Sequence, residues 1–180
     1  MWSVRKVTTW GDSGSVSRSP EIDSEMTKFV VGIGNLLLRD EGVGCHVAHA
    51  LQEIGPSGVE VMDAGTCADA LQLIQDIDKL VIVDAAKGGG KPGQIYRFRP
   101  EDIGREQKTF VSLHDMDLLD DLMLMKIRGD IRETVIIGVE PKELSWGLEL
   151  STEVGEKMPQ IVDAVLAEVN NTSPKGEMKC

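Results

Sequence analysis

The sequence is poor in cysteine and in basic residues. Its three cysteines, Cys45, Cys67 and Cys180, are an odd number without a CxxC pair, so neither a disulfide framework nor a thiolate zinc site is indicated. Lys and Arg number 19 against 30 Asp and Glu, which gives a net charge of −11 at pH 7. Because this charge repels phosphate backbones and anionic lipids, neither a nucleic acid nor a membrane is expected as a partner.

Long apolar stretches are also missing. No run approaches the roughly 20 residues needed to cross a bilayer, and the N-terminus lacks the apolar core of a secretory signal. Together with the scarcity of cysteine, these absences predict a soluble protein of the reducing cytoplasm.

Several common active-site motifs are absent as well. Gly32-x-Gly34 follows an apolar run, but Leu37 stands where the dinucleotide-binding fingerprint needs its third glycine. Gly88-Gly-Gly-Lys91 is followed by Pro92, so it is no phosphate-binding P-loop, and we interpret it as a flexible connector. The sequence contains neither GxSxG nor HExxH, which excludes the hydrolase nucleophile elbow and the helical zinc protease.

What the sequence does contain is a set of apolar runs, at 29–33, 59–62 and 80–83, each leading into an acid or an amide. Such runs, followed by helical patterns, are typical of buried parallel strands. The carboxyl ends of parallel strands lie along one edge of the sheet, where ligands bind. We therefore expect the polar residues to share one rim, although a capping or turn role for each stays open. These residues are Asn35, Asp40, Glu41, Asp63 and Asp84.

The chain length of 180 residues fits one domain. Residues 1–27 are predicted to be a disordered extension, residues 28–169 the folded domain and residues 170–180 a flexible tail, since both ends lack apolar periodicity. Strands alternating with helices predict an α/β fold, a mostly parallel twisted sheet sandwiched between helices.

The helical patterns can be placed more closely. One apolar stripe predicts a helix from Val43 to Ile54, and Ala70, Leu71, Ile74 and Ile77 suggest a second. Residues 94–98 are predicted to form an edge strand, 116–127 a helix and 134–139 a core strand. The last helix should begin with Ser151 or Thr152 as its cap, and Pro159 predicts either a kink or a later helical start.

Histidine occurs only at three positions. His46 and His49, with Glu53 one turn further, have the spacing of a metal-binding helix face, but they lie off the apolar stripe and a solvated face is the preferred interpretation. His114 lies in an irregular stretch, where it could point into a cleft, cap a helix or sit at the surface.

The ordered set of motifs resembles one family. The set comprises Gly32-Ile-Gly-Asn35, Asp40-Glu-Gly-Val-Gly44, Asp63-Ala-Gly-Thr66, Ile82-Val-Asp-Ala85, Ser112-Leu-His114 and Gly138-Val-Glu-Pro141. In this order and spacing, over about residues 28 to 169, they are similar to the hydrogenase maturation proteases. That resemblance implies an endopeptidase of aspartic type that removes the C-terminal extension of a nickel-iron hydrogenase large-subunit precursor once nickel is inserted.

The resemblance also implies the site. Glu41, Asp84 and His114 match the family's metal-binding positions and are the expected catalytic residues. Two carboxylates and an imidazole suit a borderline divalent ion such as nickel or zinc. The metal expected is the nickel held by the substrate precursor, and zinc or cadmium could replace it in vitro. Asp40 and Asp63 could orient the ligands, or they could serve as caps and turn residues.

Two other functions stay open at this stage. One is a noncatalytic, nickel-sensing chaperone of the same precursor, which would bind without shortening it. The other is a general Rossmann-type binding module, which the incomplete glycine fingerprint disfavours.

Overall fold

The computed structural model describes residues 26–67, 71, 74–102 and 115–171. Most of the predicted N-terminal extension, most of the predicted C-terminal tail and His114 lie outside these residues. Within the described part of the chain, none of the helices is long and apolar enough to cross a membrane.

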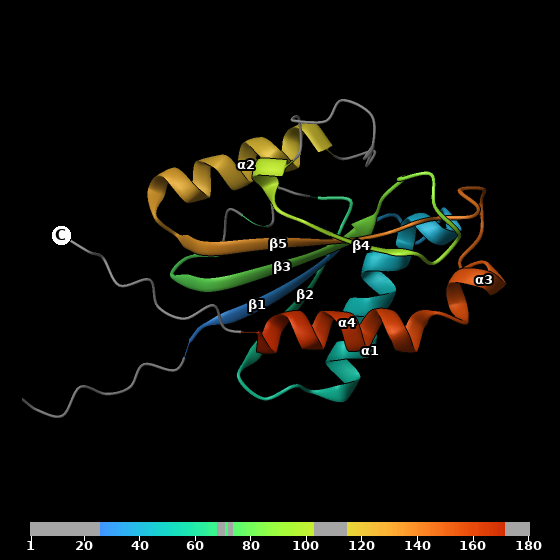
Figure 1. Ribbon diagram of the computed structural model, residues 1–180, viewed down its shortest axis with the longest axis horizontal. Helices are drawn as coiled ribbons and strands as arrows, with labels where there is room; N and C mark the ends of the chain where they lie inside the picture. Colours follow the sequence, from blue (N-terminus) through green and yellow to red (C-terminus); the bar gives the residue numbers. More distant parts are fainter. Residues whose placement is uncertain (1–25, 68–70, 72–73, 103–114, 172–180) are drawn as a thin grey trace, which may run out of the picture.

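A five-stranded sheet forms the centre of the molecule (Figure 1). Its strands have the spatial order β2-β1-β3-β5-β4; β1, β2, β3 and β5 run parallel, and β4 is an antiparallel edge strand beside β5. The mostly parallel sheet and the added edge strand are therefore confirmed. The strands are β1 (Lys28–Ile33), β2 (Val59–Gly65), β3 (Ile77–Ala85), β4 (Ile95–Phe98) and β5 (Ile131–Val139).

Helices cover both faces of this sheet. In Figure 1, α2 lies on one side, and α1 and α4 lie on the other. Pro159 stands in the first turn of α4, where its missing N–H costs no helical hydrogen bond, so the later helical start is confirmed. The predicted cap of the last helix is wrong, because Ser151 precedes a separate short helix and Lys157 stands at the cap position of α4. The helices are α1 (Val43–Ile54), α2 (Asp115–Arg128), α3 (Thr152–Gly155) and α4 (Met158–Asn170), and the 3₁₀ turns are η1 (Arg39–Gly42) and η3 (Pro100–Asp102).

The core has two layers, because alternate residues of each strand point to opposite faces. On β3, Val81 and Val83 pack with the apolar residues of α1 and α4, whereas Leu80 and Ile82 pack with Leu122 and other apolar residues on the opposite face. Each such fully buried side chain contributes about 1.5–3 kcal/mol of burial free energy. The apolar runs therefore fix the sheet between its helices.

The predicted second helix does not extend to Ile77, so that part of the prediction is wrong. Ile77 is the first residue of β3 and pairs with Ile131, and its N–H donates to the carbonyl of Asp130. Asp76 just before it has a φ of 57°, a left-handed conformation that a helix cannot continue through. Ile74 and Ile77 are both buried, so their spacing reflects burial and not helical periodicity. Residues 68–70 and 72–73 lie outside the described part.

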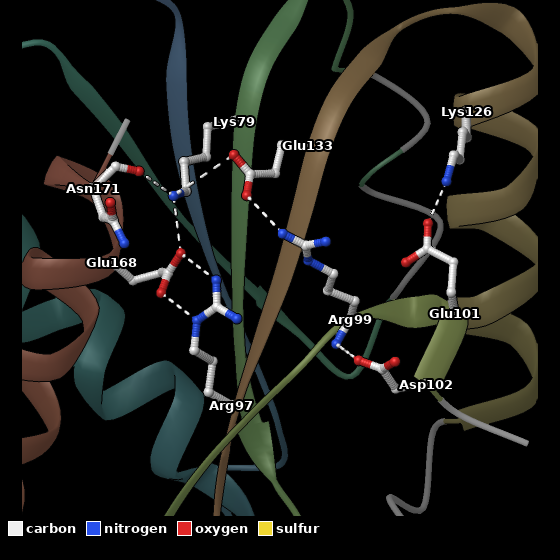
Figure 2. A network of polar contacts seen from close by, with 9 residues as sticks. All are labelled: Lys79, Arg97, Arg99, Glu101, Asp102, Lys126, Glu133, Glu168 and Asn171. Atoms are coloured by element: carbon white, nitrogen blue, oxygen red, sulfur yellow. Dashed lines mark hydrogen bonds and ion pairs between the residues drawn. The ribbon is translucent and has the colours of Figure 1, made fainter. Parts of the chain in front are cut away.

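A buried lysine connects the sheet to the end of α4 (Figure 2). Lys79 on β3 is 1% exposed, and its Nζ lies 2.9 Å from Oε1 of Glu168 and 2.6 Å from the carbonyl oxygen of Asn171. Arg97 of β4 holds the same Glu168 carboxylate by two hydrogen bonds, of 2.6 and 3.0 Å. Glu133 of β5 lies 3.8 Å from Lys79. These contacts neutralise the lysine charge and attach α4 to the sheet.

Replacing Glu168 by leucine should therefore destabilise the protein by about 3 kcal/mol, because removing one partner of a buried ion pair leaves the other charge uncompensated. Chemical denaturation measures the effect. Adding Lys79→Met to Glu168→Leu should restore most of the loss, since an apolar pair of similar volume replaces a buried ion pair at little cost. A double variant as unstable as the single one would contradict this account.

The loss of stability caused by Glu168→Leu should depend on pH. Hydrogen bonds from Arg97, and then from Lys79, hold the pKa of the Glu168 carboxyl below its ordinary value of 4.5, although burial opposes them. A lowered folded-state pKa stabilises the fold fully above the unfolded value, and this stabilisation is lost as the pH falls through the folded value. The melting-temperature gap between wild type and Glu168→Leu should thus narrow below about pH 4.5.

Candidate active site

Glu41 lies in η1, the short turn between β1 and α1, and its side chain is buried. This turn packs closely on the end of β1. A side chain at Gly34 would bring its Cβ to 2.0 Å from the carbonyl oxygen of Glu41, and a Cβ at Gly44 would meet the carbonyl oxygens of Ile33 and Val83 at 2.2 Å. Gly34 and Gly44 therefore allow the segment from η1 to α1 to pack closely against the strands. This packing role requires no bound dinucleotide.

Asp84 is the penultimate residue of β3 and pairs in register with Gly138 of β5. Its side chain is buried, and Oδ1 accepts a hydrogen bond of 2.7 Å from the N–H of Ala85. The turn that carries Glu41 contacts β3. Glu41 and Asp84 thus belong to adjoining elements at the carboxyl-end rim of the sheet, while His114, the third expected site residue, lies outside the described residues.

Asp40, the residue before Glu41, forms hydrogen bonds with the segment that follows β5. It is fully buried, and its carboxylate accepts hydrogen bonds from the backbone N–H groups of Lys142, Glu143 and Ser151 and from the Ser151 hydroxyl, at 2.7–2.9 Å. Asp40 therefore fastens the segment that follows β5 to the turn that carries Glu41. Among the roles weighed for Asp40, the structure supports shaping the loops.

Asp63 at the end of β2 also organises local structure. Its Oδ1 accepts a hydrogen bond from the N–H of Gly65, and its Oδ2 lies 2.6 Å from Nε2 of His49 on α1. Burial raises the pKa of Asp63, but hydrogen bonds from Cys45, Gly65 and His49 outweigh burial and hold the pKa below 3.8. Asp63 therefore lies within β2, where it binds the backbone of Gly65 and pairs with His49.

Cys45 of α1 is buried beside Asp63, and its thiol donates to the carbonyl of Gly34 at 3.3 Å. Burial, followed by the neighbouring Asp63, raises the pKa of its thiol to about 12. Since the thiolate is the reactive form, Cys45 is not suited to act as a nucleophile.

The histidines of α1 do not form a common metal-binding face. His49 is exposed and pairs with Asp63, whereas His46 is partly buried and its burial lowers its pKa. The expected solvated face is thus right for His49 and wrong for His46. No group of three His, Cys, Asp or Glu side chains in the described ranges is arranged to hold a metal ion, and those ranges exclude His114.

The glycine-rich loop after β3 closes around Glu140. Backbone N–H groups of Gly88 and Gly90 donate to Oε2 of Glu140 at 2.7 and 3.2 Å, and the Tyr96 hydroxyl donates to the same oxygen at 2.6 Å. Burial raises the pKa of Glu140, but these hydrogen bonds outweigh burial and lower it. The N–H groups that could have cradled a phosphate are thus occupied by the protein's own carboxylate, which fits the failed P-loop motif.

Glu140 and Ser151 were not singled out from the sequence for these contacts. A Glu before a proline and a Ser before a helix are common turn and cap signals. Their partners, Gly88 and Asp40, are 52 and 111 residues away in the chain, and no local pattern points to such distant pairs.

The chain is similar in sequence to known proteins of one family. The sequence profile of the family described as hydrogenase maturation protease matches residues 45–168. The hydrogenase 2 maturation protease of Escherichia coli is 30% identical over 149 residues, which cover 79% of this chain and 90% of the relative.

Solved structures agree with the sequence match. The hydrogenase maturation protease HybD from Thermococcus kodakarensis superposes with a TM-score of 0.71 at 28% identity, covering 81% of this chain and 100% of that one. The hydrogenase-maturating endopeptidase HybD from E. coli superposes with a TM-score of 0.68 at 28% identity, covering 79% of this chain and 91% of that one.

Proposed function

We propose a specific reaction for this chain, which belongs to the hydrogenase maturation protease family and is an endopeptidase. In this proposal it removes the C-terminal extension of a nickel-iron hydrogenase large-subunit precursor after nickel insertion, in the cytoplasm. Glu41, Asp84 and His114 recognise the nickel carried by that precursor and serve as the catalytic side chains of an aspartic-type endopeptidase. Family membership favours this reaction over a noncatalytic chaperone.

The observation that carries the proposal is the placement of two acids. Glu41 and Asp84 are buried, and they come from adjoining elements at the rim where open α/β sheets bind ligands. Asp40 binds the loop after β5, and Asp63 binds Gly65 and His49. Glu41 and Asp84 are the two described acids at the positions that the family resemblance assigns to metal recognition.

The chemistry of the set fits nickel as cargo. Carboxylate oxygens and an imidazole nitrogen suit a borderline divalent ion, and three ligands leave positions open for groups that the substrate supplies. A cation recognised here would strengthen the acidity of any water close to it. The negative charges of Glu41 and Asp84 would attract the metal. Because both side chains are buried, bulk water would screen this attraction only weakly.

A metal titration tests the residues directly. The purified protein should bind one nickel or cadmium ion per chain, and Ala in place of Glu41, Asp84 or His114 should weaken binding by about tenfold or more. Isothermal titration calorimetry measures the affinity and the number of sites. His46→Ala and His49→Ala are the matched controls and should bind as the wild type does. Weakening by these two substitutions with a silent His114→Ala would move the site to α1 and contradict the assignment.

A further inference from the structure

Three large apolar side chains are exposed close to the turn that carries Glu41. Trp146 is 78% exposed, Leu148 66% and Leu37 51%. Single exposed apolar residues are ordinary on a protein surface, but a group of them marks an interaction site. A tryptophan is also the residue type most enriched among those that dominate binding energy at interfaces.

Backbone contacts bring the three residues together. Gly147 forms a parallel bridge with Leu38: its N–H donates to the carbonyl of Leu37 at 3.0 Å, and its carbonyl accepts the N–H of Arg39 at 2.9 Å. Trp146 and Leu148 flank Gly147, so they lie beside Leu37, although more than a hundred residues separate the two segments. We call the three side chains the Trp146 patch.

Hydrogen bonds fix the patch beside the turn that carries Glu41. Leu37 precedes the η1 turn that contains Glu41, and Asp40 binds the backbone of Lys142, Glu143 and Ser151 on both sides of the patch. A preorganised surface loses little conformational freedom when a partner binds, so more of the contact energy appears as affinity. The patch is therefore a fixed apolar surface that adjoins the turn that bears Glu41.

We infer that the Trp146 patch docks an apolar segment of the precursor polypeptide beside the bond that is cleaved. The inference rests on the proposed function, because a protease that cuts a folded precursor must bind the polypeptide next to the recognised metal. The patch supplies apolar contacts and Glu41 supplies charge, so the patch and this acid recognise different features of one substrate.

Steady-state cleavage of the purified, nickel-loaded large-subunit precursor tests this inference. Trp146→Ala should raise KM by about tenfold with kcat nearly unchanged, since it removes binding common to the ground and transition states. Leu148→Ser should act in the same direction. Ile127→Ala, which removes an 80% exposed side chain from α2, is the matched control and should leave KM unchanged. An unchanged KM for both patch variants would overturn the inference.

A binding measurement separates this inference from the proposed reaction. Trp2→Phe and Trp10→Phe in the full chain leave Trp146 as the remaining tryptophan of three, and 5-fluorotryptophan labelling gives it its own ¹⁹F resonance. Precursor should shift this resonance whether or not it is cut. A shift without cleavage would sink the proposed reaction and support docking; cleavage without a shift would do the reverse. A shift with protein concentration alone would assign the patch to a second copy of the chain and overturn the inference.

Discussion

Replacing Glu41 by glutamine is expected to stop precursor cleavage while the protein stays folded. Glutamine keeps the size of the side chain but removes the negative charge that attracts a cation. If Glu41 recognises nickel or acts in catalysis, the cleavage rate should fall by about a hundredfold or more. The rate is measured by gel shift of the precursor, and thermal melting of the same sample reports the fold.

Glu53→Gln is the matched control for this substitution. Glu53 is an exposed acid on α1, so its replacement changes the net charge equally without touching the rim, and cleavage should continue at the wild-type rate. Full cleavage by Glu41→Gln would remove Glu41 from the site. Loss of the fold in Glu41→Gln would show that its charge is structural and would equally contradict the expected result.

Asp40→Ala should cause the largest loss of stability, about 3 kcal/mol or more. The substitution leaves the backbone N–H groups of Lys142, Glu143 and Ser151 without the carboxylate that they share. A hydrogen bond to a charged acceptor contributes about 1.5–3 kcal/mol, and of these three donors the N–H of Ser151 belongs to a buried residue. Urea denaturation followed by circular dichroism measures the free energy of unfolding. The rate of precursor cleavage should fall as well, because the loop after β5 would no longer be fixed to the turn that carries Glu41.

Ser151→Ala is the graded comparison. It removes only the hydroxyl that donates to Asp40 at 2.8 Å and keeps the three backbone hydrogen bonds. Its loss should be about 1.5 kcal/mol, the value of one hydrogen bond to a charged acceptor. Equal stability of Asp40→Ala and Ser151→Ala would show that the carboxylate does not organise this loop.

The sequence predicted the sheet well because buried strands leave a strong local signal. The runs at 29–33 and 80–83 became β1 and β3, and the strand predicted at 134–139 became most of β5. The ends were less accurate: β2 and β3 extend through Asp63 and Asp84, because strand length depends on the neighbouring strand as well as on hydrophobicity. Ile77 was assigned to a helix, since spacing alone cannot separate a buried strand from a buried helix.

Polar contacts between distant segments could not be predicted in the same way. Lys79 directly precedes the apolar run 80–83, and no local pattern points to its partners at the C-terminal end of α4, Glu168 and Asn171, which Figure 2 shows. Asp40 and Glu41 are adjacent acids in one motif, and only the fold reveals that Asp40 is used for the loop after β5. Hydrophobic periodicity reports burial, whereas the partner of a buried charge is set by tertiary structure.

Incubation of the purified protein with matched nickel-loaded and nickel-free large-subunit precursors tests the central claim most directly. The account predicts that the nickel-loaded precursor is shortened at its C-terminus, as seen by intact mass spectrometry, and that the nickel-free precursor keeps its full length. Equal shortening of both precursors, or of neither, would contradict the claim that this endopeptidase reads the metal before it cuts.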